Sequence, residues 1–292
     1  MSFVTQSKIR NLIKLVSFYS KLITKENLVD YIKKWSLEKE HNQAAILGNG
    51  PSLNESLKNF SEDYISSNDF FAVNNFCTHD MYAKIKPRNY VMSDPMFFEP
   101  LNVRYQEQQK VWDKLIESTN WQMSIFVPYC YFKNKKVRDI SINKKLNLVP
   151  FHSIPFLGSQ KATFSIYKKG LGNGEYATVV LHALYIAIQQ GYKVVDFYGI
   201  DHNFFDGLYV DENNVLYSRQ THFDEDIKKR LCFCYGKDFS WQPYTMDVFL
   251  QEKSFIFYGH KIMNAYAVSK GCRVYNCTSN TLVDAYERKS MK

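Results

Sequence analysis

The sequence predicts an α/β protein with a Rossmann-like, mostly parallel sheet and helices on both faces. From residue 43 onward, short apolar runs of strand length alternate with helical stretches, as in sheets whose crossover connections are helices. The strand candidates are Ala44–Leu47, Asp69–Val73, Asn89–Met92, Ser124–Pro128, Lys193–Tyr198 and Cys272–Asn276. The helices are expected near 54–60, 78–84, 101–117, 175–190, 260–270 and 280–288.

The turn after the first of these strands predicts a binding site for a phosphate. It reads Gly48-Asn49-Gly50-Pro51-Ser52. Its glycines allow a positive φ and a close approach of the backbone, and its proline favours the start of a helix. Ser52 then places a hydroxyl near a helix N-terminus, where backbone N–H groups can bind an anion. An ordinary tight turn after a core strand could have the same residues.

Short segments with polar or turn-forming residues also follow three of the other predicted strands. They are Asn74 and Asn75, then Ser93, Asp94 and Pro95, and finally Gly199, Ile200 and Asp201. Because α/β proteins bind ligands at the carboxyl ends of their parallel strands, these residues are expected to line one crevice. A second anion or carboxylate site is expected at Asn173 and Gly174, with Thr178 near the first turn of the following helix.

Residues 1–40 differ from the main domain, which is expected to span 41–292. Apolar residues recur at helical spacing between Ile9 and Ile23 and alternate with lysines and an arginine, which predicts a basic amphipathic helical extension. This helix could pack on the main domain, contact another copy of the chain or lie on an anionic membrane surface. Within the main domain, the irregular segment at about 202–257 is expected to be a lid-like insertion beside the crevice.

Composition indicates a globular chain with an anionic partner. The net charge of +8 fits nucleotide phosphates, nucleic acid or acidic lipid headgroups. Nucleic acid is the least favoured, because the positive charge is spread along the chain and no known nucleic-acid module is present. No apolar run approaches the roughly 20 residues that cross a bilayer, and neither a signal peptide nor paired cysteine spacing is found, so a cytoplasmic location is expected.

Motifs for two common nucleotide chemistries are missing. The third glycine of a dinucleotide-binding fingerprint does not follow Gly48 and Gly50, and no Walker lysine is present, so hydride transfer and P-loop phosphotransfer are poorly supported. Asp201-His202-Asn203 only loosely resembles a metal-binding DxD motif, because its third position is Asn. No metal site is therefore expected.

His260 is the histidine whose sequence context best suits a general base. It follows Tyr258 and Gly259 at the expected start of a helix, where the helix dipole lowers the pKa of an imidazole toward the neutral form. A base that accepts a proton from a hydroxyl must be neutral. A capping or core histidine would have the same context, and His182, in the middle of an expected helix, is interpreted as structural.

Taken together, these segments resemble the bacterial lipo-oligosaccharide sialyltransferases of glycosyltransferase family 42. They are also similar to a broader group of bacterial proteins with a related domain, which includes flagellin-glycosylation motility accessory factors. The order and spacing hold across segments 46–53, 71–76, 93–98, 191–201, 258–260 and 274–282.

The resemblance implies a GT-A-like variant of the fold and a role for several residues. Asn49 and the Gly50 turn would hold the ribose and phosphate of a cytidine nucleotide, and Asn74 would contact the CMP-sugar. Tyr209 would contact the leaving-group phosphate, and His260 would be the general base. The implied reaction is a metal-independent, inverting transfer, in which the acceptor hydroxyl loses its proton to His260 while CMP departs.

Three departures from the family pattern bear on the donor. Asp94 stands where the family has a donor-binding asparagine, and Asn203 stands where it has the first of two phosphate-binding tyrosines. The family's Thr/Ser-Gly near the donor carboxylate is replaced in segment 172–178. Another nonulosonic acid, Kdo or a non-CMP sugar nucleotide would be compatible with these changes.

The resulting hypothesis is a CMP-sugar-dependent, sialyltransferase-like glycosyltransferase that makes a surface glycan on a lipid-linked or other glycan acceptor. It would need no resident cofactor, could form a homo-oligomer and could bind the inner face of the cytoplasmic membrane peripherally. One alternative is a Mg²⁺-dependent pyrophosphokinase or phosphotransferase with Asp94 and Asp201 as metal ligands; another is a non-catalytic glycan-assembly protein. The candidate donor-binding residues are Gly48, Asn49, Gly50, Ser52, Asn74, Asp94, Asn173, Gly174, Thr178, Gly199, Asp201 and Asn203.

Overall fold

The fold is α/β and Rossmann-like, as predicted, in a computed structural model that describes residues 8–32, 39–102, 104–174, 178–220, 228–231, 233–235 and 241–290. Its central sheet has eight strands in the order β13-β12-β6-β1-β2-β3-β4-β5, and all neighbouring strands are parallel. The strands are β1 Gln43–Leu47, β2 Asp69–Val73, β3 Asn89–Val91, β4 Met123–Pro128, β5 Leu146–Phe151, β6 Val194–Tyr198, β12 Arg273–Asn276 and β13 Glu287–Arg288.

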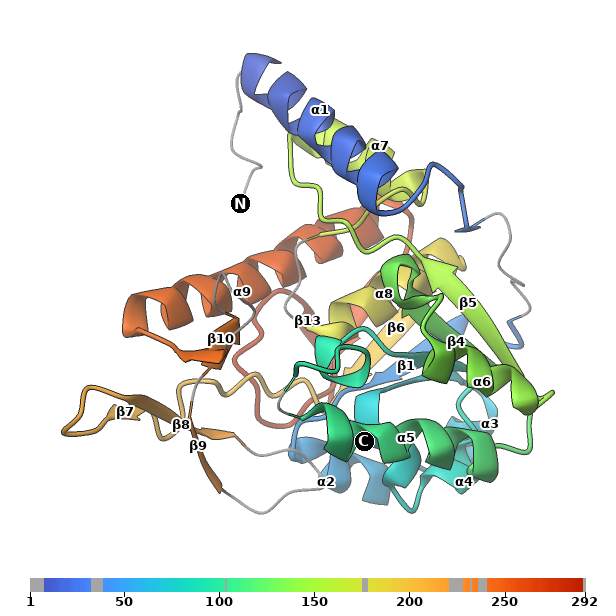
Figure 1. The fold of residues 1–292 in the computed structure, drawn as a ribbon. Helices are drawn as coiled ribbons and strands as arrows, with labels where there is room; N and C mark the ends of the chain where they lie inside the picture. Colours follow the sequence, from blue (N-terminus) through green and yellow to red (C-terminus); the bar gives the residue numbers. More distant parts are fainter. Residues whose placement is uncertain are drawn as a thin grey trace.

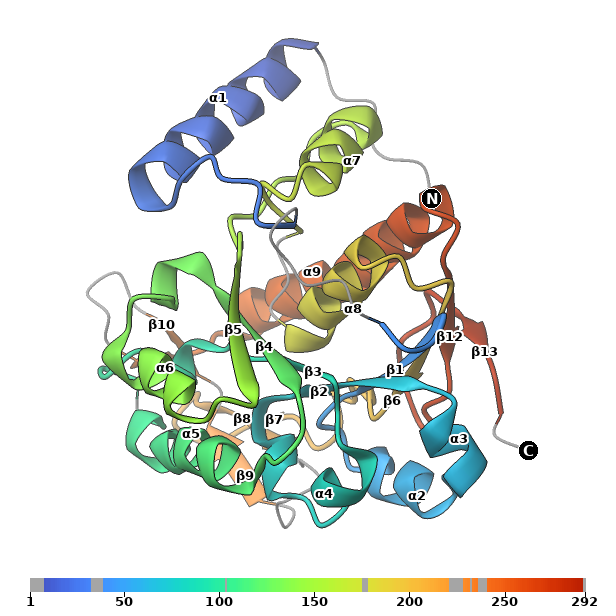
Figure 2. The same cartoon turned by 90° about the vertical axis from the view of Figure 1, so that its right-hand side faces the viewer.

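Helices cover both faces of this sheet (Figure 1; Figure 2). Alternate residues of β1 point to opposite faces: Ala44 and Ile46 join the core beneath α8 and α9, and Ala45 and Leu47 join the core beneath α2 to α6. The helices are α1 Lys8–Lys25, α2 Ser52–Lys58, α3 Glu62–Ser66, α4 Tyr82–Ile85, α5 Tyr105–Ser118, α6 Lys135–Asp139, α7 Gln160–Lys168, α8 Val179–Gln189 and α9 Met246–Ser269. None of the described helices is long and apolar enough to cross a membrane.

Several element predictions were wrong, and the short helices α3 and α6 and helix α7 were not predicted. The edge strand β5 was missed because Pro150 interrupts it, and proline is tolerated at a sheet edge. The segment expected as a helix at 280–288 is irregular and ends in β13. The last helix, expected at 260–270, begins as α9 at Met246, so residues 246–257 of the expected lid belong to a helix.

The described residues in the rest of the insertion include two small antiparallel sheets outside the main sheet. One contains β7 Tyr209–Val210, β8 Leu216–Gln220 and β9 Lys228–Leu231; the other contains β10 Phe233–Tyr235 and β11 Trp241–Pro243. Figure 1 shows β7 and β8 projecting beyond the carboxyl ends of the main strands.

The N-terminal helix packs on the main domain through one stripe. Phe18 and Leu22 are buried in the core that contains α7 and α8. Asn11 Oδ1 accepts a hydrogen bond from Ser159 N at 2.8 Å, and Lys14 Nζ donates one to Leu157 O at 2.9 Å. After the helix ends, Glu26 pairs with the buried His152. These contacts fix the inner side of α1.

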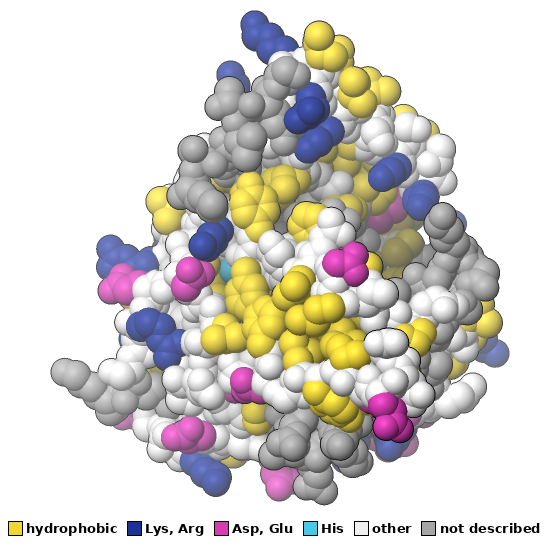
Figure 3. All heavy atoms as spheres, turned by 90° about the vertical axis from the view of Figure 1, so that its left-hand side faces the viewer, with side chains coloured by type: hydrophobic (Ala, Val, Ile, Leu, Met, Phe, Trp, Pro, Cys, Tyr) yellow, Lys and Arg dark blue, Asp and Glu magenta, His cyan; other side chains and the backbone are white. Residues whose placement is uncertain are grey.

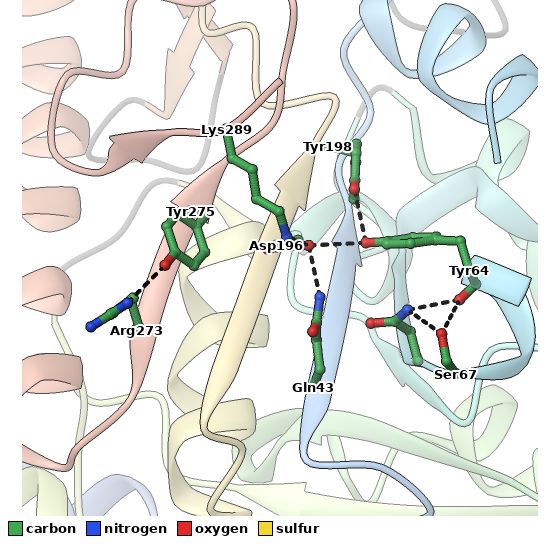
Figure 4. A network of polar contacts seen from close by, with 9 residues as sticks. Gln43, Tyr64, Ser67, Asp196, Tyr198, Arg273, Tyr275 and Lys289 are labelled. Carbon is green, nitrogen blue, oxygen red and sulfur yellow. Dashed lines mark hydrogen bonds and ion pairs between the residues drawn. The ribbon is translucent and has the colours of Figure 1, made fainter. Parts of the chain in front are cut away.

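A buried carboxylate joins β6 to its neighbours (Figure 4). Asp196 is fully buried, and its Oδ2 accepts hydrogen bonds from Gln43 at 2.9 Å, Tyr64 at 3.1 Å and Lys289 at 2.8 Å. Tyr198 donates a further bond to the Tyr64 hydroxyl at 2.8 Å. A buried charge with several donors is stable only while those donors remain, so this network should contribute to stability.

We expect Tyr64→Phe to lower the free energy of unfolding by about 1.5–3 kcal/mol, because it removes a hydrogen bond to a charged, buried acceptor. Urea denaturation would measure the change. The control is Tyr105→Phe on α5, which removes a tyrosine hydroxyl at a site remote from Asp196. It should change the free energy of unfolding by less than about 0.5 kcal/mol. An equal loss in both variants would contradict a specific role for this network.

Candidate functional site

The order of the strands places a crevice between β1 and β6. The chain proceeds outward from β1 to β5 and then returns to the other side of β1 as β6. Two connections therefore diverge at the carboxyl ends of β1 and β6, and such a switch point is the usual ligand site of an open α/β sheet. The turns there contain residues 48–52 and 199–203, which the sequence had singled out.

Three glycines allow these two turns to touch. Gly48 N donates to Tyr198 O at 2.8 Å, and Gly50 N donates to Gly199 O at 2.8 Å. A Cβ on Gly48 would lie 2.4 Å from Gly199 O, and one on Gly50 would lie 1.8 Å from Asp201 Oδ2. Only Gly199 of the three has a positive φ, at +67°. Of the two properties expected of Gly48 and Gly50, the close approach of the backbone is confirmed and the positive φ is not used.

Asp201 occupies the N-terminus of α2. Its Oδ1 accepts a hydrogen bond from Ser52 N at 3.2 Å, and its Oδ2 accepts one from Ser52 Oγ at 2.7 Å. Burial raises the pKa of Asp201, although both bonds from Ser52 oppose this. The donors that the sequence assigned to a phosphate are thus already bound to a carboxylate of the chain.

Asparagine side chains at the same edge have unused capacity for hydrogen bonds. Among the described residues, the Oδ1 atoms of Asn49, Asn74 and Asn203 are buried without a hydrogen-bond partner. Asn74 also has a φ of +49°, and its backbone oxygen accepts a bond from Tyr90 Oη at 2.6 Å. Since buried polar atoms are normally paired, these oxygens could accept hydrogen bonds from the hydroxyls or amino group of a ligand.

Two histidines and a tyrosine form a chain of contacts beside these turns. Nε2 of His202 lies 3.0 Å from Nε2 of His260, and Nδ1 of His260 lies 3.0 Å from the hydroxyl of Tyr286. His202 has a φ of +50°, in the left-handed region that few non-glycine residues adopt. Non-glycine residues in this region are often found at functional sites.

The two histidines differ in their access to solvent. His260 is fully buried in the middle of α9, whereas His202 is half-buried at the end of β6. The prediction that His260 begins a helix was wrong, and the dipole is not what lowers its pKa. Burial lowers it well below the ordinary value, helped by His202. Burial also lowers the pKa of His202 to about 3, and the positive charge of Lys253 adds to this. Both imidazoles are neutral at pH 7.

Of the other candidates, Asp94 follows β3 at the same edge of the sheet, whereas Tyr209 lies on the projecting β7–β8 hairpin. Asp94 Oδ1 accepts a bond from Met96 N at 3.1 Å and so caps a short 3₁₀ helix. Ser93 Oγ lies 2.8 Å from Nδ1 of His182, whose pKa burial lowers to about 4. Tyr209 is on β7, stacked on Tyr217 with ring centroids 5.2 Å apart. Its role at the leaving group stays a prediction.

The second predicted anion site has a different local structure. The helix expected from residue 175 begins as α8 at Val179, and residues 175–177 lie outside the described part of the chain. Gly174 and Thr178 stand on either side of them. Asn173 is fully buried and donates from Nδ2 to His152 O at 3.1 Å, beyond the end of β5. Its Oδ1 has no hydrogen-bond partner.

Within the described ranges, one group has the composition of a metal site. It contains Glu40, His41 and Asp69 and lies at the amino ends of β1 and β2, across the sheet from the crevice. Asp69 already accepts bonds from Tyr192 Oη at 2.8 Å and from the backbone of residues 40 and 41, and it pairs with Arg88. This carboxylate therefore anchors the strand ends.

Sequence reasoning missed His202 and Tyr286 as members of the site. His202 was considered only within a loose metal motif, although its place directly after Asp201 could have indicated a role. Tyr286 gave no usable signal, because it falls in the segment wrongly expected to be helical. When the chain is compared with known proteins, no protein-family model matches it and no curated protein matches it.

Proposed function

We propose that this protein is a metal-independent glycosyltransferase that uses a nucleotide-activated sugar, with a CMP-sugar as the favoured donor. The observation that supports this most strongly is the neutral His202–His260–Tyr286 chain beside the tight turns at the switch point. It provides a candidate base at the place where an α/β sheet binds its ligand. The choice of CMP rests on the resemblance to family 42.

His202 is the better candidate base, and His260 is a positioning residue. When Nδ1–H of His260 donates a hydrogen bond to the Tyr286 hydroxyl, the unprotonated Nε2 of His260 can accept a hydrogen bond from Nε2–H of His202. Nδ1 of His202 is then unprotonated and can take the proton of an acceptor hydroxyl. The acceptor oxygen forms a bond to the anomeric carbon, the bond from that carbon to the phosphate oxygen breaks, and CMP leaves with the electron pair.

The low pKa of His202 in the free protein makes it a weak base until the donor binds. The phosphate of a nucleotide, and the carboxylate of a keto-sugar, bring negative charge into the crevice. Opposite charge within a few ångströms stabilises an imidazolium and raises its pKa. Donor binding would therefore strengthen the base when it is needed.

The asparagine oxygens support a donor rich in hydroxyl groups. Asn49, Asn74 and Asn203 each offer a buried acceptor without a partner, and ribose, cytosine and sugars all carry matching donors. The alternative phosphotransferase needs carboxylates for Mg²⁺. Asp201 is bound to Ser52, and Asp94 caps its own 3₁₀ helix, so the geometry favours glycosyl transfer over that alternative.

Thermal unfolding with CMP, CDP, UDP, GDP and ATP, each with EDTA or with Mg²⁺, would test this proposal. A ligand at 100 times its Kd should add about 2.7 kcal/mol of stability, which raises Tm by a few degrees. We expect CMP to stabilise the protein in EDTA, and Asn74→Ala to reduce this shift. A preference for UDP, GDP or ATP that requires Mg²⁺ would contradict the proposal and return attention to Asp94 and Asp201.

A further inference from the structure

The outer side of α1 carries a row of exposed apolar side chains. These side chains lie on one face of the helix, and each has 62–73% of its surface exposed. They are Ile9, Leu12, Ile13, Val16 and Ile23. We call this row the outer stripe. A contiguous exposed apolar surface of this kind usually marks an interaction site, whereas scattered apolar residues do not. Burial of such side chains is favourable by about 25 cal/mol per Å².

The main domain does not need the outer stripe for its own core. The opposite side of α1 is already packed through Phe18 and Leu22 and tied through Asn11 and Lys14. Helix α1 thus has two apolar sides, one covered by the domain and one facing outward. The sequence predicted that this helix packs on the main domain, contacts another copy or lies on a membrane. Its inner side packs on the domain, and the outer stripe is available for a second contact.

The charge of α1 indicates what covers the outer stripe. The helix contains Lys8, Arg10, Lys14, Lys21 and Lys25 and no acidic residue. Figure 3 shows dark blue and yellow side chains together at the top of the molecule, the end where Figure 1 places α1. A second copy would bring ten cationic side chains together without a carboxylate from either helix, and like charges repel at such distances. An anionic lipid surface would complement them instead.

We propose that α1 docks this protein on a bilayer with anionic headgroups. The helix lies in the plane of the interface, with the outer stripe in the acyl boundary and the exposed ammonium groups of Lys8 and Lys21 reaching toward the headgroup phosphates. Its 18 residues extend about 27 Å along the surface. This inference is independent of the proposed function, because lipid binding needs neither donor nor acceptor.

Cosedimentation of the full chain with vesicles would test the docking. We expect binding to vesicles of phosphatidylcholine with phosphatidylglycerol, much weaker binding to phosphatidylcholine alone, and weakening as salt rises. The double variant Ile13→Ser with Val16→Ser should lower the partition coefficient about tenfold or more, since both side chains would leave the acyl boundary. Lys8→Gln with Lys21→Gln should weaken binding to the anionic vesicles only.

Matched controls exist elsewhere on the surface. Ile142 and Val268 are 69% and 68% exposed, so Ile142→Ser with Val268→Ser makes the same chemical change away from α1 and should bind as the parent does. Circular dichroism would establish that each variant folds. Equal binding by all variants, or no binding to anionic vesicles, would overturn the proposal. So would a dimer in sedimentation velocity that Ile13→Ser with Val16→Ser dissociates, because a second copy would then cover the stripe.

Discussion

Replacing His202 with Gln should lower kcat for sugar transfer by roughly 10²–10⁴-fold, the range that a general base contributes. The KM for the donor should change little, because His202 acts on the acceptor hydroxyl. His260→Gln should cost less, since His260 only orients its neighbour through the 3.0 Å contact. Tyr286→Phe should cost least, and Tyr258→Phe on the same helix as His260 is the matched control.

The order of these losses separates the two candidate bases. If His260 itself accepted the proton, as its sequence context and the family resemblance suggested, His260→Gln would be the more damaging change and His202→Gln the milder. Retention of full activity by both variants would remove the basis for acid–base chemistry at this site. Absence of sugar transfer by the parent protein, with CMP still stabilising it, would instead favour the non-catalytic alternative.

The pH dependence provides a second readout. In the free protein His202 has a pKa of about 3, so kcat/KM should not fall around pH 6.5, where an ordinary histidine takes up its proton. In the donor complex, negative charge raises the pKa, and the acid limb of kcat should therefore lie at higher pH than that of kcat/KM. His260→Gln should move both limbs. Coincident limbs with a midpoint near 6.5 would show that neither burial nor the donor controls the base.

The sequence predicted the framework and the edge of the sheet where the site lies, because both depend on local patterns. Apolar runs of strand length and the turn residues that follow them are visible without any knowledge of tertiary structure. That information was enough to place Gly48, Asn74 and Asp201 at strand ends. The same information missed β5, because Pro150 breaks its apolar pattern. Proline is tolerated in this strand because β5 lies at the edge of the sheet.

The partners of the polar residues could not be predicted, because they come from distant parts of the chain. Asp201 meets Ser52 across 149 residues, and His202 meets His260 across 58. The local sequence predicted that Ser52 binds a phosphate and that His260 begins a helix. Helix α9 actually begins at Met246. This start depends on how its first two turns pack against the insertion through Phe249, and no local pattern specifies that packing.

Replacing Gly50 with Ala should be strongly destabilising. The new Cβ would lie 1.8 Å from Asp201 Oδ2 and 2.8 Å from Gly199 O, so the Asp201 carboxylate or the turn must move. Overpacking costs about 1–3 kcal/mol, and loss of the bonds from Ser52 to a charged group adds about 1.5–3 kcal/mol. We expect Tm to fall by about 5 °C or more and the stabilisation by CMP to disappear.

A control variant and a double-mutant cycle would trace this effect to its cause. The control is Gly191→Ala, because Gly191 has a φ of +81° and an added Cβ would meet open space. This variant should lose only the strain energy of a left-handed alanine, about 1–2 kcal/mol. In an Asp201→Ala background the main clash is absent, so Gly50→Ala should cost at least 1 kcal/mol less than it does alone, a coupling expected of residues in contact. Additive losses would mean that contact with Gly199 O, rather than with Asp201, requires glycine at this position.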